Sequence, residues 1–417
     1  MDSNHLSMSV IIPVYNGGDD FRRCLKALLS SLTPSADWAA KDEGAQYRIQ
    51  RGKVGGSALV DTRRNLFDYA IDGKRPVEII VVSDGDSDGS WRLAELFGVR
   101  LIRLPESGGP AKARNIGAKS ASGDILFFVD ADVEVHADTL SKTIESFEAN
   151  SHLAALIGSY DDAPGAPNFL SQYKNLIHHY THQRASLEAS TFWGACGAIR
   201  RHVFEEVGGF DENYRRPCIE DIELGYRLKY AGQQIHLRSD IQVKHLKRWT
   251  PLSLLRADIF YRALPWTDLL RKVQRSHPAF YRRFTQELNL DWRSKVSVVL
   301  VFGLVFGLVF GLVFGLLLAV FVHLLGSGYE AGSGALAIAN AAASSTAGLL
   351  VWQLAIGAVI AMCGLGLLLI NWPIYRFFYR KHGWIFALKT VPWHWLYFLY
   401  SGLVYAYTAI RYRLRPG

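Results

Sequence analysis

The chain has 417 residues, of which 49% are hydrophobic, and a formal net charge of +8. This length and composition allow a sizeable core in more than one domain and exclude a disordered or fibrous protein. Residues 292–417 hold nine Lys and Arg against one acid, Glu330, so the excess charge lies in that segment. Because these basic residues lie beside apolar runs, they favour contact with anionic lipid headgroups, and no nucleic-acid partner is expected.

The spacing of the cysteines indicates the redox state of the compartment. Cys24, Cys196, Cys218 and Cys363 follow no CxxC or metal-ligand spacing, which predicts neither a zinc site nor a disulfide framework and fits a reducing compartment. The first ten residues lack a basic stretch followed by a long apolar run, so no cleaved signal peptide is expected. We therefore predict that the N-terminal domain stays in the cytoplasm.

Between residues 8 and 240, short β-branched runs alternate with amphipathic stretches, which is typical of an α/β fold with a mostly parallel sheet and flanking helices. The runs of strand length are Met8 to Val14, Val77 to Ser83, Val99 to Leu104 and Ile125 to Val129. Open α/β sheets bind ligands outside the carboxyl ends of their strands. The polar residues expected at that edge are Asn16, Asp84, Asp130 and Asp132.

Composition divides the chain into three parts. Residues 1–243 are expected to form the α/β domain, in which the polar, glycine-bearing stretch 33–76 is interpreted as a surface insertion. Residues 244–291 are basic and aromatic and are expected to form amphipathic helices in the headgroup layer. Residues 292–417 are predicted to be a transmembrane region.

Three apolar segments lie in this last part. Residues 296–325 and 349–370 are long enough to span a bilayer, whereas 393–410, rich in Tyr and Trp, is expected to be a third span or an interfacial segment. The linker between the first two has no Lys or Arg and should face outward, and the basic stretch 376–389 should face the cytoplasm. Glycines at every fourth position of 303–315 form GxxxG spacings, but sequence drift in an apolar repeat is the favoured interpretation.

The predicted chemistry begins with a pair of acids. Asp130 and Asp132 follow the run ILFFV, so their carboxylates project to one side of a strand end while Ala131 points to the other. Such a pair suits a hard divalent cation, and a divalent cation neutralises a departing diphosphate.

This acidic pair belongs to an ordered set of motifs. They are SVIIPVYN (9–16), EIIVVSDGDSDGS (78–90), GGPAKARN (108–115), GDILFFVDAD (123–132), GACGAIRR (194–201), GGFDE (208–212) and IEDIELGYRL (219–228). Over residues 8–250 the set resembles family 2 glycosyltransferases of the GT-A fold. Ser83 departs from the pattern, because the family commonly has Asp there. The resemblance implies an inverting enzyme of the hexosyltransferase type.

The resemblance also implies a donor site for a nucleotide sugar. The implied donor-binding residues are Pro13, Tyr15, Asn16, Asp84, Lys112, Arg114 and Asp130. Among them, Asp84 would hydrogen-bond the base, Asp130 would contact the sugar, and Lys112 and Arg114 would lie near the phosphates. An alternative for Arg114 is that it only organises the first turn of a helix.

The implied metal ligands are Asp132 and His245, with Mg²⁺ or Mn²⁺ as the cofactor; the alternative for His245 is a structural role. Glu220 and Asp221 match the ED motif of the family. Since an acceptor hydroxyl becomes a good nucleophile as its proton leaves, Asp221 is the candidate base and Glu220 the residue that positions it. An alternative is that these acids only charge a helix N-terminus.

The candidates for contact with a phosphate or an acceptor are Arg200, Arg201, Arg248 and Trp249. The last two match the end of the QxxRW motif of processive polysaccharide synthases, but His245 stands in place of its Gln.

The sequence therefore predicts a metal-dependent glycosyltransferase that uses a UDP-sugar by default and a lipid-linked or membrane acceptor at the cytoplasmic face. One alternative is a processive polysaccharide synthase, weakened by the missing Gln and the few spans. Another is a catalytically silent membrane scaffold that binds nucleotide sugar, against which Asp130, Asp132 and Asp221 argue.

Overall fold

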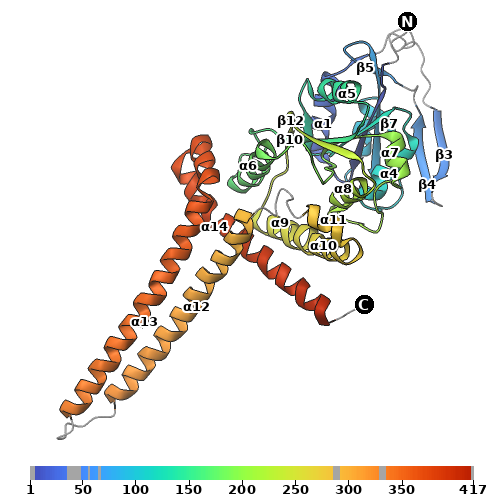
Figure 1. The fold of residues 1–417 in the computed structure, drawn as a ribbon. Helices are drawn as coiled ribbons and strands as arrows, with labels where there is room; N and C mark the ends of the chain where they lie inside the picture. Colours follow the sequence, from blue (N-terminus) through green and yellow to red (C-terminus); the bar gives the residue numbers. More distant parts are fainter. Residues whose placement is uncertain are drawn as a thin grey trace. The chain divides into compact units, whose positions relative to one another are not determined.

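The computed structural model describes residues 5–34, 48–54, 57–63, 67–284, 292–327 and 335–414. The chain forms two compact units, unit 1 (Met1–Leu288) and unit 2 (Asn289–Gly417). Unit 1 holds the sheet and its helices, and unit 2 is helical (Figure 1).

The strands of unit 1 among the described residues form one mixed sheet. They are β1 (Met8–Val14), β2 (Thr33–Pro34), β3 (Arg48–Val54), β4 (Ser57–Arg63), β5 (Tyr69–Ile71), β6 (Arg75–Asp84), β7 (Arg100–Leu104), β8 (Ile125–Val129), β9 (Val133–Val135), β10 (Leu153–Tyr160), β11 (Cys196–Arg200) and β12 (Gln234–His245). Their order is β3-β4-β7-β6-β1-β8-β11-β10-β12-β9, and β5 pairs with β6 and β2.

The centre of this sheet is the predicted α/β core. Strands β7, β6, β1 and β8 run parallel and cover the four predicted runs to within two residues. Outside them, β11 is antiparallel to both β8 and β10, and β9 is antiparallel to β12, which makes the sheet mixed as a whole. Because β6, β1 and β8 are parallel, the residues that follow them meet at one edge.

Helices cover both faces of the sheet. They are α1 (Gly18–Ser30), α3 (Trp91–Leu96), α4 (Pro110–Ser120), α5 (Thr139–Ala149), α6 (Phe169–Arg184), α7 (Arg201–Glu206) and α8 (Glu220–Tyr230). Alternate residues of one strand point to opposite faces. In β1, Val10 and Ile12 pack in a core with α1 and α5, whereas Ile11 packs in a second core with α4, α7 and α8. These two buried cores therefore hold α1 and α5 on one face of the sheet and α4, α7 and α8 on the other.

Part of the predicted insertion 33–76 extends the sheet. Strands β3 and β4 form an antiparallel hairpin, and β4 pairs with β7. Arg100 of β7 and the buried Asp61 of β4 form an ion pair of 2.9 Å between these two paired strands. Residues 35–47, 55–56 and 64–66 of the insertion lie outside the described residues.

Unit 1 continues past the sheet into α9 (Pro251–Arg256), the π-helix η1 (Ala257–Ala263), α10 (Leu264–Ser276) and α11 (Pro278–Phe284). Two polar contacts attach this helical segment to the domain. Lys174 Nζ of α6 donates to Asp258 at 2.7 Å, and Trp266 Nε1 donates to the Tyr226 hydroxyl of α8 at 3.0 Å.

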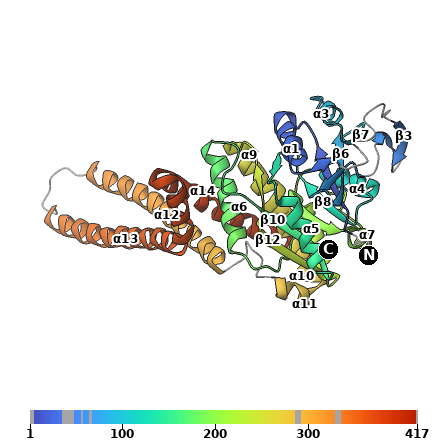
Figure 2. The ribbon, with the colours of Figure 1, turned by 90° about the horizontal axis from the view of Figure 1, so that it is seen from above.

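Unit 2 consists of α12 (Trp292–Ser327), α13 (Ala335–Ile370) and α14 (Trp372–Leu414), and α12 and α13 lie side by side (Figures 1 and 2). Among the described residues, two helical segments are long and apolar enough to cross a membrane, Trp292–Leu317 and Val351–Ile370. They overlap the predicted spans 296–325 and 349–370. The third predicted segment, 393–410, is helical within α14, which is broken at Gly383.

Three of the four glycines in the α12 repeat lie against α13, which favours a packing role over the interpretation as drift. A Cβ added at Gly303 would lie 2.9 Å from Cys363 Sγ of α13. An added Cβ at Gly307 would lie 3.0 Å from Ile360 of α13, and one at Gly311 would lie 3.1 Å from Ile356 of that helix. Small residues spaced by four thus let α13 approach. Composition could not show this because it does not reveal which helix lies alongside.

We expect Gly307→Leu to destabilise unit 2 by about 1–3 kcal/mol, because the added side chain would be forced into α13. Gly315→Leu is the matched control, since a Cβ at Gly315 meets nothing within 4 Å. The measurement is denaturant unfolding of the full chain in detergent, and equal stability of the two variants would contradict the packing role.

Candidate active site

The loops after β1 and β6 form one end of the candidate site. Asn16 follows β1 with a positive φ of 52°, and its Oδ1 accepts hydrogen bonds from the backbone of Ser87 and Asp88 at 2.8 Å and 3.3 Å. Its neighbour Tyr15 is 58% exposed. Asn16 therefore joins the two loops, and the Tyr15 ring is accessible to a ligand.

Asp84, at the end of β6, organises the start of α4. Its carboxylate accepts hydrogen bonds from the backbone of Gly108 and Gly109 at 2.7 Å and 2.9 Å and from the Ser107 hydroxyl at 2.8 Å. Gly109 has a φ of 91°, and a Cβ there would lie 2.4 Å from the Arg215 carbonyl oxygen, so only glycine fits. The base contact assigned to Asp84 stays a prediction beside this structural role.

Arg114 of α4 connects the two acidic motifs. Its guanidinium, 5% exposed, donates to Glu220 Oε1 at 2.8 Å and to Asp130 Oδ1 at 2.7 Å. Burial alone would lower the pKa of Arg114, but the charges of Asp130 and Glu220 outweigh it and raise that pKa. The sequence predicted that Arg114 lies near the phosphates or organises a helix turn. Neither prediction included this bridge between two carboxylates.

Asp221 lies in the first turn of α8, beside Glu220. Its carboxylate accepts hydrogen bonds from Gly194 N at 3.1 Å and Ile222 N at 2.8 Å. Burial and the charge of Glu220 raise the pKa of Asp221 to about 7, against the opposing charge of Arg114. A carboxyl group with a pKa near neutrality can accept a proton from a reacting hydroxyl at physiological pH.

Asp132 and His245 face each other across the β9–β12 pairing. His245 Nε2 lies 3.6 Å from Asp132 Oδ2, and Leu246 N donates to the Asp132 carbonyl oxygen at 2.9 Å. Burial would raise the pKa of Asp132, but the nearby His245 and Lys247 lower it to about 2. Asp132 is therefore ionised at neutral pH and can act as an oxygen ligand.

These two groups fit a divalent cation only in part. A carboxylate oxygen and an imidazole nitrogen are both donors that such cations accept. Among the residues that the structure describes, no group of three or more His, Cys, Asp or Glu side chains could hold a metal ion. Further ligands would have to come from the substrate or water.

Two family models match this part of the chain. Residues 57–208 match the model described as glycosyl transferase family 2, and residues 174–248 match the model described as the N-terminal domain of galactosyltransferase. Unit 1 contains a family 2 glycosyltransferase domain. The first range includes Arg114 and Asp132, and the second includes Asp221 and His245.

Relatives match the chain over part of their length. An uncharacterized glycosyltransferase of Escherichia coli K12, YibD, is 31% identical over 134 residues, which are 31% of this chain and 27% of the relative. The poly-beta-1,6-N-acetyl-D-glucosamine synthase of Staphylococcus aureus COL is 28% identical over 193 residues, which are 42% of this chain and 44% of the relative. The chain thus spans less than half the length of these two relatives.

A solved mannosyltransferase, PcManGT from Pyrobaculum calidifontis in complex with GDP-Man and Mn²⁺, has a TM-score of 0.46 and 16% identity to this chain. The alignment covers 88% of each chain.

The remaining predicted site residues lie in different places. Pro13 of β1 and Lys112 of α4 are half-buried. Arg248 is exposed, whereas Trp249 is buried and its backbone N–H donates to the Ser171 hydroxyl at 2.7 Å. Trp249 thus anchors the chain to α6.

Arg200 and Arg201 are not brought to the site. In the antiparallel pairing of β11 with β8, Arg200 lies opposite Ile125, the first residue of β8, so both arginines are at the sheet edge away from Asp130. Arg200 donates to the Leu153 carbonyl oxygen and Arg201 to the Gly123 carbonyl oxygen, both at 2.9 Å. Their predicted contact with phosphate is corrected to a structural role, because β11 turns back along β8.

Two site residues were missed by the sequence analysis, Asn175 of α6 and Tyr160 at the end of β10. Asn175 bonds His245 at 2.7 Å, and the Tyr160 ring stacks on the His245 ring. No local pattern marks either residue, because both contact His245 of β12, which is distant from them in the sequence.

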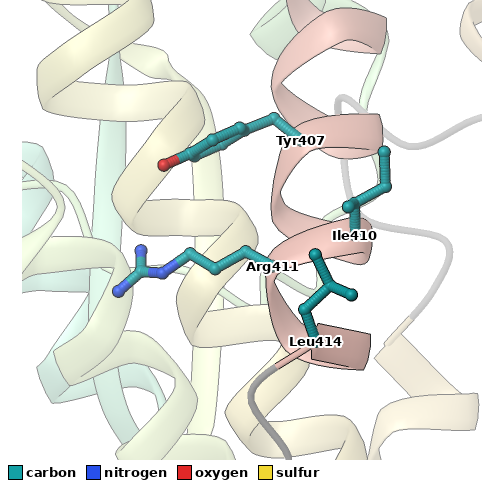
Figure 3. A pocket seen from close by; sticks show the side chains of 4 residues that line it. All are labelled: Tyr407, Ile410, Arg411 and Leu414. Atoms are coloured by element: carbon teal, nitrogen blue, oxygen red, sulfur yellow. The ribbon is translucent and has the colours of Figure 1, made fainter.

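A pocket on unit 2 is lined by Tyr407, Ile410, Arg411 and Leu414 (Figure 3). All four side chains come from α14, and none of the four is a carboxylate or an imidazole that could take part in sugar transfer.

The bridge made by Arg114 predicts a large effect on stability. We expect Arg114→Met to lower the free energy of unfolding by about 3–5 kcal/mol, because it leaves the buried Glu220 without its cation. The exposed Arg248 offers the control, and Arg248→Met should change stability by less than about 0.5 kcal/mol. Denaturant unfolding in detergent measures both, and similar values would show that the bridge contributes little.

Proposed function

We propose that this glycosyltransferase transfers a sugar, with inversion, from a nucleotide diphosphate to a lipid-linked or other membrane acceptor at the cytoplasmic face. UDP-sugar is the default donor. The observation that carries the proposal is the carboxyl group of Asp221, whose pKa is about 7. Its neighbour Glu220 pairs with Arg114, and Arg114 also pairs with Asp130, the first residue of the acidic pair.

The residues divide the reaction between them. The acceptor hydroxyl oxygen attacks the anomeric carbon, its proton passes to a carboxylate oxygen of Asp221, and the bond to the diphosphate breaks. One attack from the side opposite the leaving group inverts that carbon. Glu220 is held by Arg114 and by the backbone N–H of Cys218 at 2.8 Å, so it positions the helix turn that carries the base.

The donor would lie along the loops after β1 and β6, with Asp130 at the sugar. Asp132 and His245 would hold Mg²⁺ or Mn²⁺, which when bound neutralises charge on the departing diphosphate. If the acceptor were a lipid phosphate, already ionised, Asp221 would orient groups and accept no proton.

Membrane attachment is supported by composition. The two apolar segments Trp292–Leu317 and Val351–Ile370 are long enough to span, and the basic stretch 376–389 favours a cytoplasmic position for the residues between the second and third apolar segments. The basic and aromatic helices α9 to α11 would lie in the headgroup layer beside the acceptor.

Processive polysaccharide synthesis is the second candidate, favoured by the similarity to the Staphylococcus aureus synthase. His245 in place of the motif's Gln argues against it. The two candidates differ in product length, so a single added sugar supports the proposal and a polymer supports the alternative.

The first experiment measures nucleoside diphosphate release from UDP-, GDP- and TDP-sugars by the full chain in native-like membranes with lipid extract. We expect release from one donor, lost on chelation and reduced by at least about 100-fold in Asp221→Asn, the scale of a positioned base. Metal-dependent nucleotide binding without release from any donor would favour the silent scaffold.

The pKa of Asp221 predicts the pH dependence of that release. Because the base works only when deprotonated, the rate should be full above its pKa of about 7 and fall roughly tenfold per pH unit below it. Initial rates at saturating donor across this range are the measurement. A rate that is flat through neutrality would remove Asp221 as the base and would fit an acceptor that is already ionised.

A further inference from the structure

His245 is held at two points by residues that the sequence did not single out. Its Nδ1 lies 2.7 Å from Asn175 Oδ1, and its ring stacks on Tyr160 with centroids 4.5 Å apart and planes 9° apart. All three residues are buried, with exposed fractions of 6% for His245, 1% for Asn175 and 8% for Tyr160. A short buried hydrogen bond and a parallel stack leave the ring little freedom to turn.

The contact with Asn175 selects one tautomer of the imidazole. With the Asn175 amide oriented so that Oδ1 faces the ring and Nδ2 has no hydrogen-bond partner among the described residues, the hydrogen in this contact belongs to His245 Nδ1, because an amide oxygen only accepts. In a neutral ring the lone pair then lies on Nε2. This nitrogen faces Asp132 Oδ2 at 3.6 Å, longer than a direct hydrogen bond. When the ring is neutral, Nε2 and the partly exposed Asp132 carboxylate are both electron-rich and are together complementary to a cation.

Tyr160 is itself fixed, so it can define the plane of the His245 ring. Trp193 packs edge-on against Tyr160 with centroids 4.7 Å apart, and His178 packs at 4.9 Å. The strand pairing β10–β12 places Tyr160 opposite Val243, two residues before His245. The sheet thus supplies the residue under the ring, and α6 supplies the residue at its edge.

We propose that Asn175 and Tyr160 are positioning residues that fix the tautomer and the ring plane of His245, so that Nε2 presents its lone pair toward Asp132. The use of this lone pair for a divalent cation rests on the proposed function. The tautomer itself does not, which allows the two to be tested separately.

The first test is Mn²⁺ binding to the full chain in detergent with UDP present, followed by electron paramagnetic resonance. Removing a partner that orients a metal-binding histidine typically weakens metal affinity by about 10–100-fold, and we expect this of Asn175→Leu. Asn175→Asp keeps an accepting oxygen and should bind Mn²⁺ at least as tightly as the natural chain. Tyr160→Phe keeps the stacked ring and should bind within about threefold of the natural chain, a change well below that range.

Asn168→Leu is the matched control for a general effect on α6. Its side chain precedes the same helix and donates to the Trp249 carbonyl oxygen at 2.8 Å, away from the His245 ring. This variant should keep the natural Mn²⁺ affinity. Natural affinity in Asn175→Leu, or an equal loss in Asn175→Asp and Asn175→Leu, would overturn the proposal.

The second test reads the tautomer without metal. Nuclear magnetic resonance of chain labelled with ¹⁵N-histidine, in mildly alkaline buffer, distinguishes the two neutral forms, and the His245→Gln spectrum assigns the signal. We expect the Nδ1–H form in the natural chain and a mixture in Asn175→Leu. The Nε2–H form in the natural chain would falsify the proposal. Nδ1–H without any Mn²⁺ binding would uphold the positioning and contradict the metal dependence of the proposed function.

Discussion

The candidate site depends on one buried cation, the guanidinium of Arg114, which pairs with Asp130 and Glu220. A buried charge is tolerated only when it is paired, so this arginine requires both carboxylates at their places. Asp130 follows β8, and Glu220 begins α8. Arg114 thereby holds the end of a strand against the start of a helix that lies about a hundred residues further along the chain.

The place of Arg114 is set by the loop before its helix. Asp84 binds the backbone of Gly108 and Gly109, which fixes the start of α4 against the end of β6. One turn later, Asn115 accepts a hydrogen bond from Phe210 N at 2.9 Å, which ties α4 to the GGFDE loop. The glycine-rich motif and the two acidic motifs thus form one connected frame around the site.

Two carboxylates of the same chemistry have opposite environments in this frame. Burial and the neighbouring Glu220 raise the pKa of Asp221 to about 7, whereas the pKa of Asp132 falls to about 2 because His245 and Lys247 outweigh its burial. A carboxyl that can exchange a proton suits a base, and one that stays ionised suits a metal ligand. The charges around each residue, more than the residue type, separate the two proposed roles.

Local pattern alone determined the central strands, the acidic residues that follow them and the two apolar helices, because strand length, alternation and long apolar runs are properties of adjacent residues. Contacts between distant segments were decided by the tertiary structure: the partners of Arg114, the turn of β11 that carries Arg200 away from the site, the packing of the α12 glycines, and the Asn175 and Tyr160 contacts to His245. Asn175 lies in a helix with no motif, 70 residues from the histidine that it orients. Neighbouring residues specify an element, but which side chains meet depends on how the elements pack, and no local pattern contains that information.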